Sequence, residues 1–148
     1  MLPVSLTMAG VAALINIWLS IRCGQVRQSE KISIGDGGNE KLIARMRAQA
    51  NFIENVPLIL ILIVLIELAL GGGDGSGHGP IWLWVVSSAI MLGRVAHALG
   101  MDDGFPLGRM IGTSLTMLSL LGLGIYAIVL PHLPYAPPAQ TETVDTVQ

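Results

Sequence analysis

The sequence predicts an all-α membrane protein, a bundle of four transmembrane helices. Hydrophobic residues make up 52% of the 148 residues and charged residues only 12%, about half the ~25% of an ordinary soluble domain. The charges lie almost wholly between long apolar runs, and one spanning helix needs roughly 20 apolar residues. Four such helices leave only short loops, which excludes a large extramembrane domain.

The composition also argues against several classes of function. A net charge of -2, with no basic stripe among aromatic residues, speaks against nucleic-acid binding. A single cysteine excludes an internal disulfide and a multi-cysteine metal site. Because His78 and His132 are separate from each other and from any carboxylate pair, we expect no metal site.

The four predicted spans carry few charges and have the length that a membrane requires. They are Leu2–Ile21, Ala50–Leu70, Pro80–Gly100 and Met110–Leu130. No Lys or Arg precedes the first span, whereas a cleaved secretory signal would carry a basic segment there, so this helix is expected to be retained. Residues 1–133 therefore form one four-helix membrane domain, and the Pro- and Thr-rich tail 134–148 is expected to be disordered.

The basic residues predict the orientation in the membrane. Six of the eight lie between the first two spans: Arg22, Arg27, Lys31, Lys41, Arg45 and Arg47. The other two, Arg94 and Arg109, flank the turn between the third and fourth spans. By the positive-inside rule both connections are cytoplasmic, and both termini and the Gly71–Gly79 loop face the other side. The chain is thus expected in a membrane, the inner membrane if it is bacterial, with its arginines on the cytoplasmic side.

The second helix is expected to begin before its membrane span. Asn39 is a suitable N-cap and Glu40 follows in the first turn, so the helix would run from there through Leu70. The Gly35–Asn39 segment is interpreted as a turn, because it lacks the Gly-Lys-Ser/Thr ending of a phosphate-binding loop.

One polar stripe marks the second helix. Arg47, Asn51 and Glu54 stand at i, i+4 and i+7, within about 60° of one another on the helix. A carboxylate inside the membrane boundary costs a few kcal/mol, so Glu54 should face protein or a wet cavity and have a partner. The simple alternative is a packing ion pair with an arginine of another helix. Since arginines end the other helices at the same depth, we favour a bound ligand with anionic and cationic groups.

Other polar residues allow both a structural and a functional interpretation. Arg94 and His97 are i, i+3 neighbours and can point into the same space, although a lone histidine here is more often packed in the core. Arg109 begins the fourth span and could instead extend to the lipid headgroups. Cys23 has no neighbouring base and is expected to be structural. Glu67 lies about 220° from the stripe and is expected to mark the far interface.

Three segments together resemble the MAPEG family, the membrane-associated proteins in eicosanoid and glutathione metabolism. The segment Arg47–Glu54, followed by Pro57, is similar to the family signature of the second helix. Gly24–Arg27 and Arg94–His97 resemble the corresponding parts of the first and third helices in the prostaglandin E synthases of that family.

The resemblance implies a homotrimer with a glutathione site between neighbouring subunits, open to the cytoplasm. The implied glutathione contacts are Arg27, Arg47, Gln49, Asn51 and Glu54, with Arg94 and His97 beside them. Arg109 matches the arginine thought to hold the thiolate, although it is one residue out of register with some members. The chain departs from the family at Met101, where many catalytic members have Tyr, and at Asn55 and Thr113, where some have Tyr.

The function that these features favour is glutathione-dependent transfer to, or peroxide reduction of, a hydrophobic substrate. An alternative is a non-enzymatic family member that binds lipid and presents it to a partner, which the missing tyrosines favour and Arg109 opposes. A third class is a small four-helix multidrug exporter, which should have an isolated intramembrane Glu and no arginine cluster.

Overall fold

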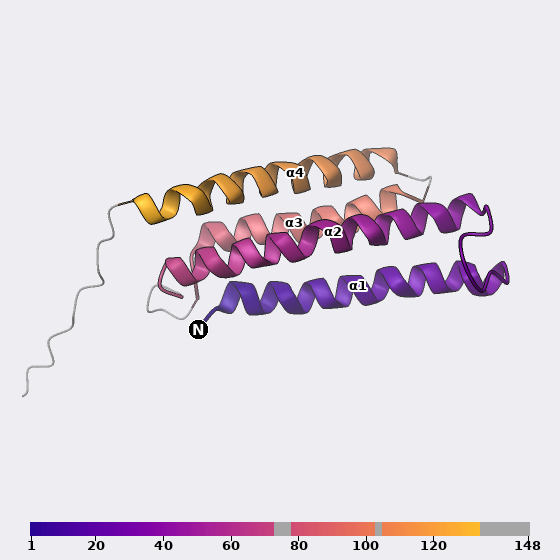
Figure 1. Ribbon diagram of the computed structural model, residues 1–148, viewed down its shortest axis with the longest axis horizontal. Helices are drawn as coiled ribbons and strands as arrows, with labels where there is room; N and C mark the ends of the chain where they lie inside the picture. Colours follow the sequence, from indigo (N-terminus) through magenta and orange to yellow (C-terminus); the bar gives the residue numbers. More distant parts are fainter. Residues whose placement is uncertain (73–77, 103–104, 134–148) are drawn as a thin grey trace, which may run out of the picture.

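The computed structural model describes residues 1–72, 78–102 and 105–133 and consists there of helices joined by short connections (Figure 1). The helices are α1 (Pro3–Ser29), α2 (Glu40–Ala69), α3 (Ile81–Gly100) and α4 (Pro106–Val129), followed by the short 3-10 helix η1 (Leu130–His132). The tail 134–148, for which disorder is predicted, lies outside the described residues.

Within those residues, four helices are long and apolar enough to cross a membrane. The shortest, α3, has 20 residues, which at 1.5 Å per residue is about 30 Å, the thickness of the hydrocarbon core. The prediction of an all-α, four-helix integral membrane protein is therefore confirmed. The helices extend past the predicted spans where a cap or a turn allows it: α1 continues to Ser29, and α4 already begins at Pro106.

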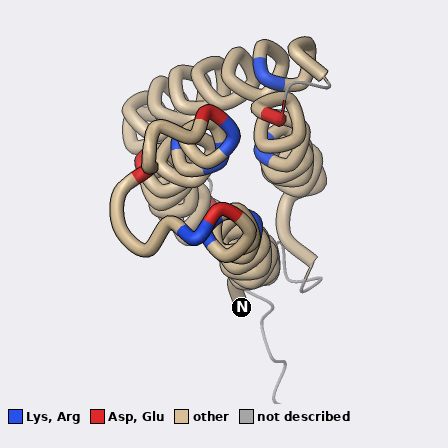
Figure 2. The backbone as a smooth tube through the Cα atoms, turned by 90° about the vertical axis from the view of Figure 1, so that its right-hand side faces the viewer, with Lys and Arg blue, Asp and Glu red and all other residues tan. Residues whose placement is uncertain are grey.

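The connection between α1 and α2 is built as the sequence predicts. The Asn39 side chain accepts a hydrogen bond from the Leu42 backbone N–H at 2.9 Å, so Asn39 is the N-cap of α2. Gly35, Gly37 and Gly38 adopt positive φ, and the Asp36 carboxylate accepts the Gly38 N–H. Gly35–Asn39 is thus a turn. Figure 2 views the bundle from this end and shows the Lys and Arg segments gathered there.

One side of each of the four long helices contributes buried residues to a single hydrophobic core. Leu19, Ile63, Ile90 and Leu123 represent the four helices in it, and each is at most 4% exposed. The opposite sides of the helices carry large exposed apolar residues, as Leu14, Leu65, Leu92 and Leu118 do. This distribution suits helices that face lipid or other apolar surfaces.

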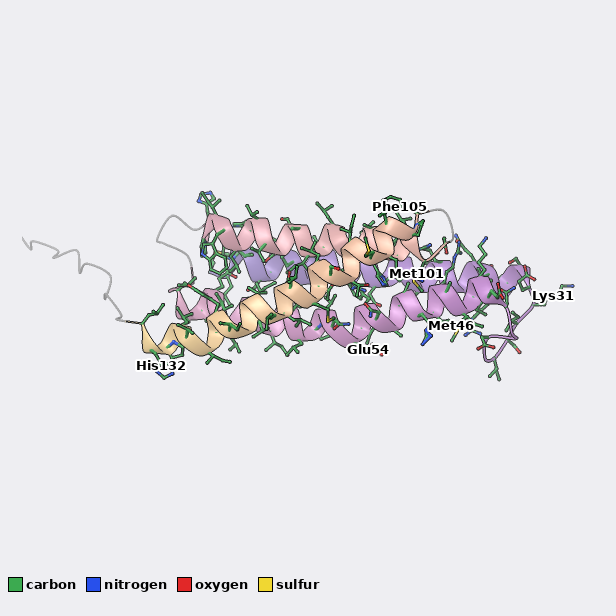
Figure 3. The ribbon with its side chains drawn as sticks, turned by 90° about the horizontal axis from the view of Figure 1, so that it is seen from above. Lys31, Met46, Glu54, Met101, Phe105 and His132 are labelled. Atoms are coloured by element: carbon green, nitrogen blue, oxygen red, sulfur yellow. The ribbon has the colours of Figure 1, made fainter. Side chains whose placement is uncertain are left out.

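Glycines bring α3 and α4 into backbone contact near the α3–α4 connection. A methyl group on Gly100 would lie 2.7 Å from the Phe105 carbonyl oxygen and would also collide with the Arg109 backbone nitrogen. A methyl group on Gly108 would lie 2.6 Å from the Ala96 carbonyl oxygen. Away from this contact α4 crosses toward α2, as Figure 3 shows for the His132 end. The glycine contact therefore fixes the position of Arg109 in the first turn of α4.

The far end of α2 carries a buried acid that closes the bundle. Glu67 is fully buried, and its carboxylate accepts hydrogen bonds from the backbone N–H groups of Val4 and Ser5, at 3.0 and 2.8 Å, and from the Ser5 hydroxyl at 2.6 Å. A carboxylate at a helix N-terminus satisfies free N–H groups and interacts favourably with the helix dipole. Glu67 lies near the far end of α2, and the structure adds a role to the expected position at the far interface: its side chain caps α1.

Candidate functional site

A cavity of about 280 Å³ lies between α2 and α3 at the charged half of the bundle. It is lined by Arg47, Ala50, Asn51 and Glu54 of α2 and by His97 and Met101 of α3. Figure 3 shows where Glu54 and Met101 lie on their two helices. The residues of the predicted stripe, Arg47, Asn51 and Glu54, therefore line one wall of this cavity. The opposite wall is formed by the C-terminal end of α3.

The polar groups of this cavity are largely unpaired within the part of the chain that the structure describes. Arg47 and Glu54 are exposed, and no described residue forms a hydrogen bond or ion pair with either side chain. His97 is 5% exposed, and its Nδ1 atom has no partner among the described residues. A buried polar atom usually has a hydrogen-bond partner, so these groups are available to bind a polar guest.

Arg94 is directed into the core rather than into the cavity. Its guanidinium donates to the Asn51 side-chain oxygen at 2.6 Å and to the Thr116 hydroxyl at 2.9 Å. The Thr116 hydroxyl in turn donates to the Gly112 carbonyl at 2.7 Å. Arg94 is 1% exposed. It therefore joins α2, α3 and α4, and it reaches the cavity only through Asn51.

A second polar cluster lies just outside the cavity, where α3 ends. Asp102 pairs with Arg22 of α1, and both of its carboxylate oxygens accept hydrogen bonds from Arg45 of α2 at 3.1 Å. Arg22 also donates to the Ala98 carbonyl at 3.1 Å, and its guanidinium lies 4.7 Å from the Trp18 ring centre. Arg22 and Arg45, two of the basic residues for which the sequence predicts the cytoplasmic side, therefore form contacts within the folded chain.

The charge state of Asp102 follows from these contacts. Burial by itself would raise the pKa of the carboxyl, but the hydrogen bonds and positive charges of Arg45 and Arg22 outweigh burial and hold that pKa below its usual range. Asp102 is therefore ionised at neutral pH, and the cluster carries two positive charges and one negative charge.

Arg109 borders a separate cavity of about 580 Å³ at the start of α4. The lining residues are His97, Pro106, Leu107, Arg109, Met110, Thr113 and Ser114. His97 is the residue that this lining shares with the cavity of Arg47 and Glu54. The Thr113 hydroxyl donates to the Arg109 carbonyl at 2.9 Å, so Thr113 is held by its own helix. The two cavities are thus neighbours with His97 between them.

Two predicted contact residues lie outside both cavities in the single chain. Arg27 donates to the Gly35 carbonyl at 2.8 Å and contacts the Met46 sulfur at 3.5 Å. Gln49 donates to the Ser20 hydroxyl at 2.7 Å. In the single chain, the arginines of the four helices therefore do not line one space: Arg47 lines the cavity, whereas Arg22, Arg27 and Arg94 bind groups of the same chain.

The sequence pattern does not single out Asp102, although it decides which arginines are free. The available signal is charge balance. Asp102 lies two residues after the end of α3, and Arg22 of α1 and Arg45 of α2 are basic residues on the same predicted side of the membrane. Cys23 is buried beside Val26 and Leu42, which agrees with the structural role expected for it.

Direct comparison with curated proteins finds no significant match. The model of the MAPEG family matches residues 5–129, which is most of the chain and includes residues of all four helices. The matched range includes the residues of α2, α3 and α4 that line the two cavities. The chain therefore belongs to the MAPEG family, a family of four-helix membrane proteins with roles related to glutathione or eicosanoids.

Proposed function

We propose that this chain is a membrane glutathione-dependent transferase or peroxidase that acts on hydrophobic electrophiles. The observation that carries the proposal is the cavity between α2 and α3, into which Arg47 and Glu54 bring opposite charges that no described residue pairs. Family membership supports a glutathione-related role in coarse terms. Two charges of opposite sign that have no partner among the described residues favour a ligand that carries both signs.

The chemistry of the cavity fits glutathione, which has two carboxylates, one ammonium group and a thiol. Arg47 would bind a carboxylate, since guanidinium–carboxylate pairs form strong, charge-assisted hydrogen bonds. Glu54 would bind the ammonium group. Asn51 and the unpartnered Nδ1 of His97 would complete the polar contacts. Arg94 supports this set by fixing the Asn51 side chain.

We further propose that a homotrimer completes the site. The cavity measures about 280 Å³, whereas ligand pockets usually have ~300–1,000 Å³, so glutathione would need a further wall. We assign Arg27 and Gln49, which lie outside the cavity in the single chain, to that wall in a neighbouring copy. The open, apolar outer faces of the helices are compatible with subunit contacts.

Arg109 is the residue that we assign to the thiol. Glutathione supplies the nucleophilic sulfur when it is bound, but a free thiol with a pKa of about 8.5 is only a few per cent ionised at neutral pH. A nearby guanidinium stabilises the thiolate, and about 1.36 kcal/mol of such stabilisation lowers the pKa by one unit. The apolar residues Leu107 and Met110 beside Arg109 suit a hydrophobic co-substrate.

The proposed topology places this site toward the cytoplasm, where glutathione is available, and both termini on the other side. The support is the distribution of basic residues, six of which lie between the first two predicted spans, Leu2–Ile21 and Ala50–Leu70. A reporter fused after Gln148 should report the non-cytoplasmic side.

Calorimetric titration of the detergent-purified protein with glutathione tests the binding proposal. We expect Arg47→Ala to weaken binding by about tenfold or more, as loss of a charge-assisted hydrogen bond predicts. Lys41→Ala, which removes a charge from an exposed residue of the same helix outside the cavity, is the matched control. Equal affinity of Arg47→Ala and the unaltered protein would refute the site.

The thiolate and the reaction are tested separately from binding. We expect Arg109→Ala to retain most of the glutathione affinity but to lose thiolate absorbance at neutral pH, because the thiol pKa rises. Conjugation of a chloronitrobenzene acceptor then measures transferase activity directly. Unchanged thiolate absorbance in Arg109→Ala would remove the assigned role from this residue.

One observation favours a second candidate, a lipid-binding scaffold without catalytic activity. Met101 lines the cavity beside His97 and has no hydroxyl group to donate, at a position where many catalytic members of the family have Tyr. Binding of glutathione without any conjugation or peroxide reduction would favour this candidate.

A further inference from the structure

Two polar bridges between α2 and α3 flank the cavity. On the side toward the middle of the helices, Arg94 donates to Asn51 at 2.6 Å. On the side toward the α1–α2 connection, Arg45 donates to both carboxylate oxygens of Asp102 at 3.1 Å. The part of the cavity lined by Arg47 and Met101 lies between these bridges, because Arg47 follows Arg45 on α2 and Met101 directly precedes Asp102. Glu54 continues the α2 wall beyond Asn51. The distance between the cavity walls is thus held at two points.

The outer bridge also reaches α1 and the last turn of α3. Arg22 pairs with Asp102 and donates to the Ala98 carbonyl at 3.1 Å, while Arg45 donates to the Arg22 carbonyl at 2.8 Å. The turn that Arg22 holds carries His97 and Met101, which form the α3 wall.

The Asp102 carboxylate balances the charges of two partly buried arginines, Arg22 and Arg45. The side chains of Arg22, Arg45 and Asp102 are 8%, 13% and 24% exposed, so solvent screens their charges only in part. Without the carboxylate, two guanidinium groups with the same charge would lie side by side, and no other acidic residue in the described part of the chain forms an ion pair with them. Their repulsion would act directly on the end of α3.

We infer that Asp102 is a positioning residue: its bridges to Arg45 and Arg22 hold the α3 wall of the cavity in place for glutathione. The inference rests on the proposed function, which names the ligand. Asp102 itself does not line the cavity, and it acts through Met101 and His97. It also keeps Arg22 and Arg45 engaged, so that Arg47 is the arginine of α2 that remains free for an anionic group.

A labelling experiment tests the wall without any ligand. Met101→Cys in a Cys23→Ser background gives one reactive thiol on the wall, and its reaction rate with a water-soluble maleimide reports how firmly the turn is held. We expect Asp102→Asn to raise this rate about tenfold, which corresponds to about 1.4 kcal/mol in the opening equilibrium. Asp102→Glu should restore a slow rate, because it retains the carboxylate. Asp36→Asn, which removes an acid from the exposed α1–α2 turn, is the matched control and should not change the rate.

The binding arm uses the otherwise unaltered sequence and calorimetry with glutathione. We expect Asp102→Asn to raise the Kd about tenfold, and Asp102→Glu to recover most of the affinity. A purely structural role would lower the melting temperature but leave the Kd of the folded protein unchanged. Arg45→Gln breaks the bridge to α2 while Arg22 still binds Asp102, so it serves if Asp102→Asn does not fold, with the same expected direction.

The outcomes separate this inference from the proposed function. Unchanged labelling and unchanged Kd in folded Asp102→Asn, or in Arg45→Gln in its place, would overturn the inference. If the unaltered protein binds no glutathione, the proposed function fails, and the labelling rates alone decide whether Asp102 holds the wall. Faster labelling with Glu rescue supports the inference in either case.

Discussion

At Gly100, the two sides of α3 are built in opposite ways. Toward α4, Gly100 meets the opposing backbone so closely that even a methyl group has no room. Toward α2, the helices leave a cavity of about 280 Å³, and the Arg94–Asn51 and Asp102–Arg45 bridges connect the two helices beside it. The closed side fixes the position of α4. The open side keeps a space whose width depends on polar contacts.

This difference separates the charges that hold the fold from those that are free for a ligand. Arg45 and Glu67 are both on α2, and each is bound by groups of other helices. Arg47 and Glu54 are on the same helix, line the cavity and have no partner among the described residues. Whether a charged side chain of α2 binds protein groups or is free for a ligand therefore depends on whether it lines the cavity, and not on its residue type.

The largest expected effect on stability comes from adding a methyl group at Gly100, where α3 contacts the backbone of α4. Gly100→Ala should cost more than about 3 kcal/mol, because the new methyl group meets backbone atoms that cannot move aside. Gly124→Ala, whose methyl group would meet nothing within 4 Å, is the control. Thermal unfolding in detergent measures both variants. A similar melting temperature for both would mean that the close contact is not required.

A smaller effect is expected where a buried acid closes the far end. Glu67→Gln should lower the free energy of unfolding by about 2 kcal/mol, because an amide replaces a carboxylate that accepts three hydrogen bonds. Ser5→Ala removes only one of these donors and should cost about half as much. If Ser5→Ala proves the more damaging of the two, Glu67 is not the centre of this contact.

Acid should weaken the outer bridge of the open side. The pKa of Asp102 is lower in the folded chain than in the unfolded chain, where it is about 3.9. The ionised carboxylate therefore stabilises the fold fully above that value, and the stabilisation is lost as the pH falls through the lower, folded value. Below about pH 4 the melting temperature of the unaltered protein should thus fall more steeply than that of Asp102→Asn. Parallel curves for the two proteins would contradict this.

The smallest effect on stability is expected at the free charges. Arg47→Ala should change the free energy of unfolding by less than about 0.5 kcal/mol, because the side chain is exposed and bound to nothing in the described chain. A clear drop in melting temperature would show that Arg47 has a structural contact after all, for example with a neighbouring subunit.

Much of this architecture can be predicted from the periodicity of the sequence and from local signals. The apolar runs predict four spanning helices, the Asn39 cap predicts where α2 begins, and the spacing of Arg47, Asn51 and Glu54 predicts that they share one face. These features depend on residues close together in the sequence. The helical period converts them into position on a surface.

Features that depend on contacts between distant segments could not be predicted in the same way. Asp102 binds Arg22 and Arg45, 80 and 57 residues away in the chain, and Glu67 caps α1 through Val4, 63 residues earlier. The same limitation applies to Arg94, which the spacing places beside His97 but which the packing directs to Thr116. Which arginines remain free is therefore decided by tertiary structure.

The most direct test of the central claim compares the same substitution at the two glutamates of α2. Glutathione affinity and melting temperature are measured on Glu54→Gln and Glu67→Gln in the same detergent. We predict that Glu54→Gln weakens glutathione binding by about tenfold or more with an unchanged melting temperature, whereas Glu67→Gln lowers the melting temperature and leaves the affinity of the folded protein unchanged. Unaltered binding in Glu54→Gln would contradict the account.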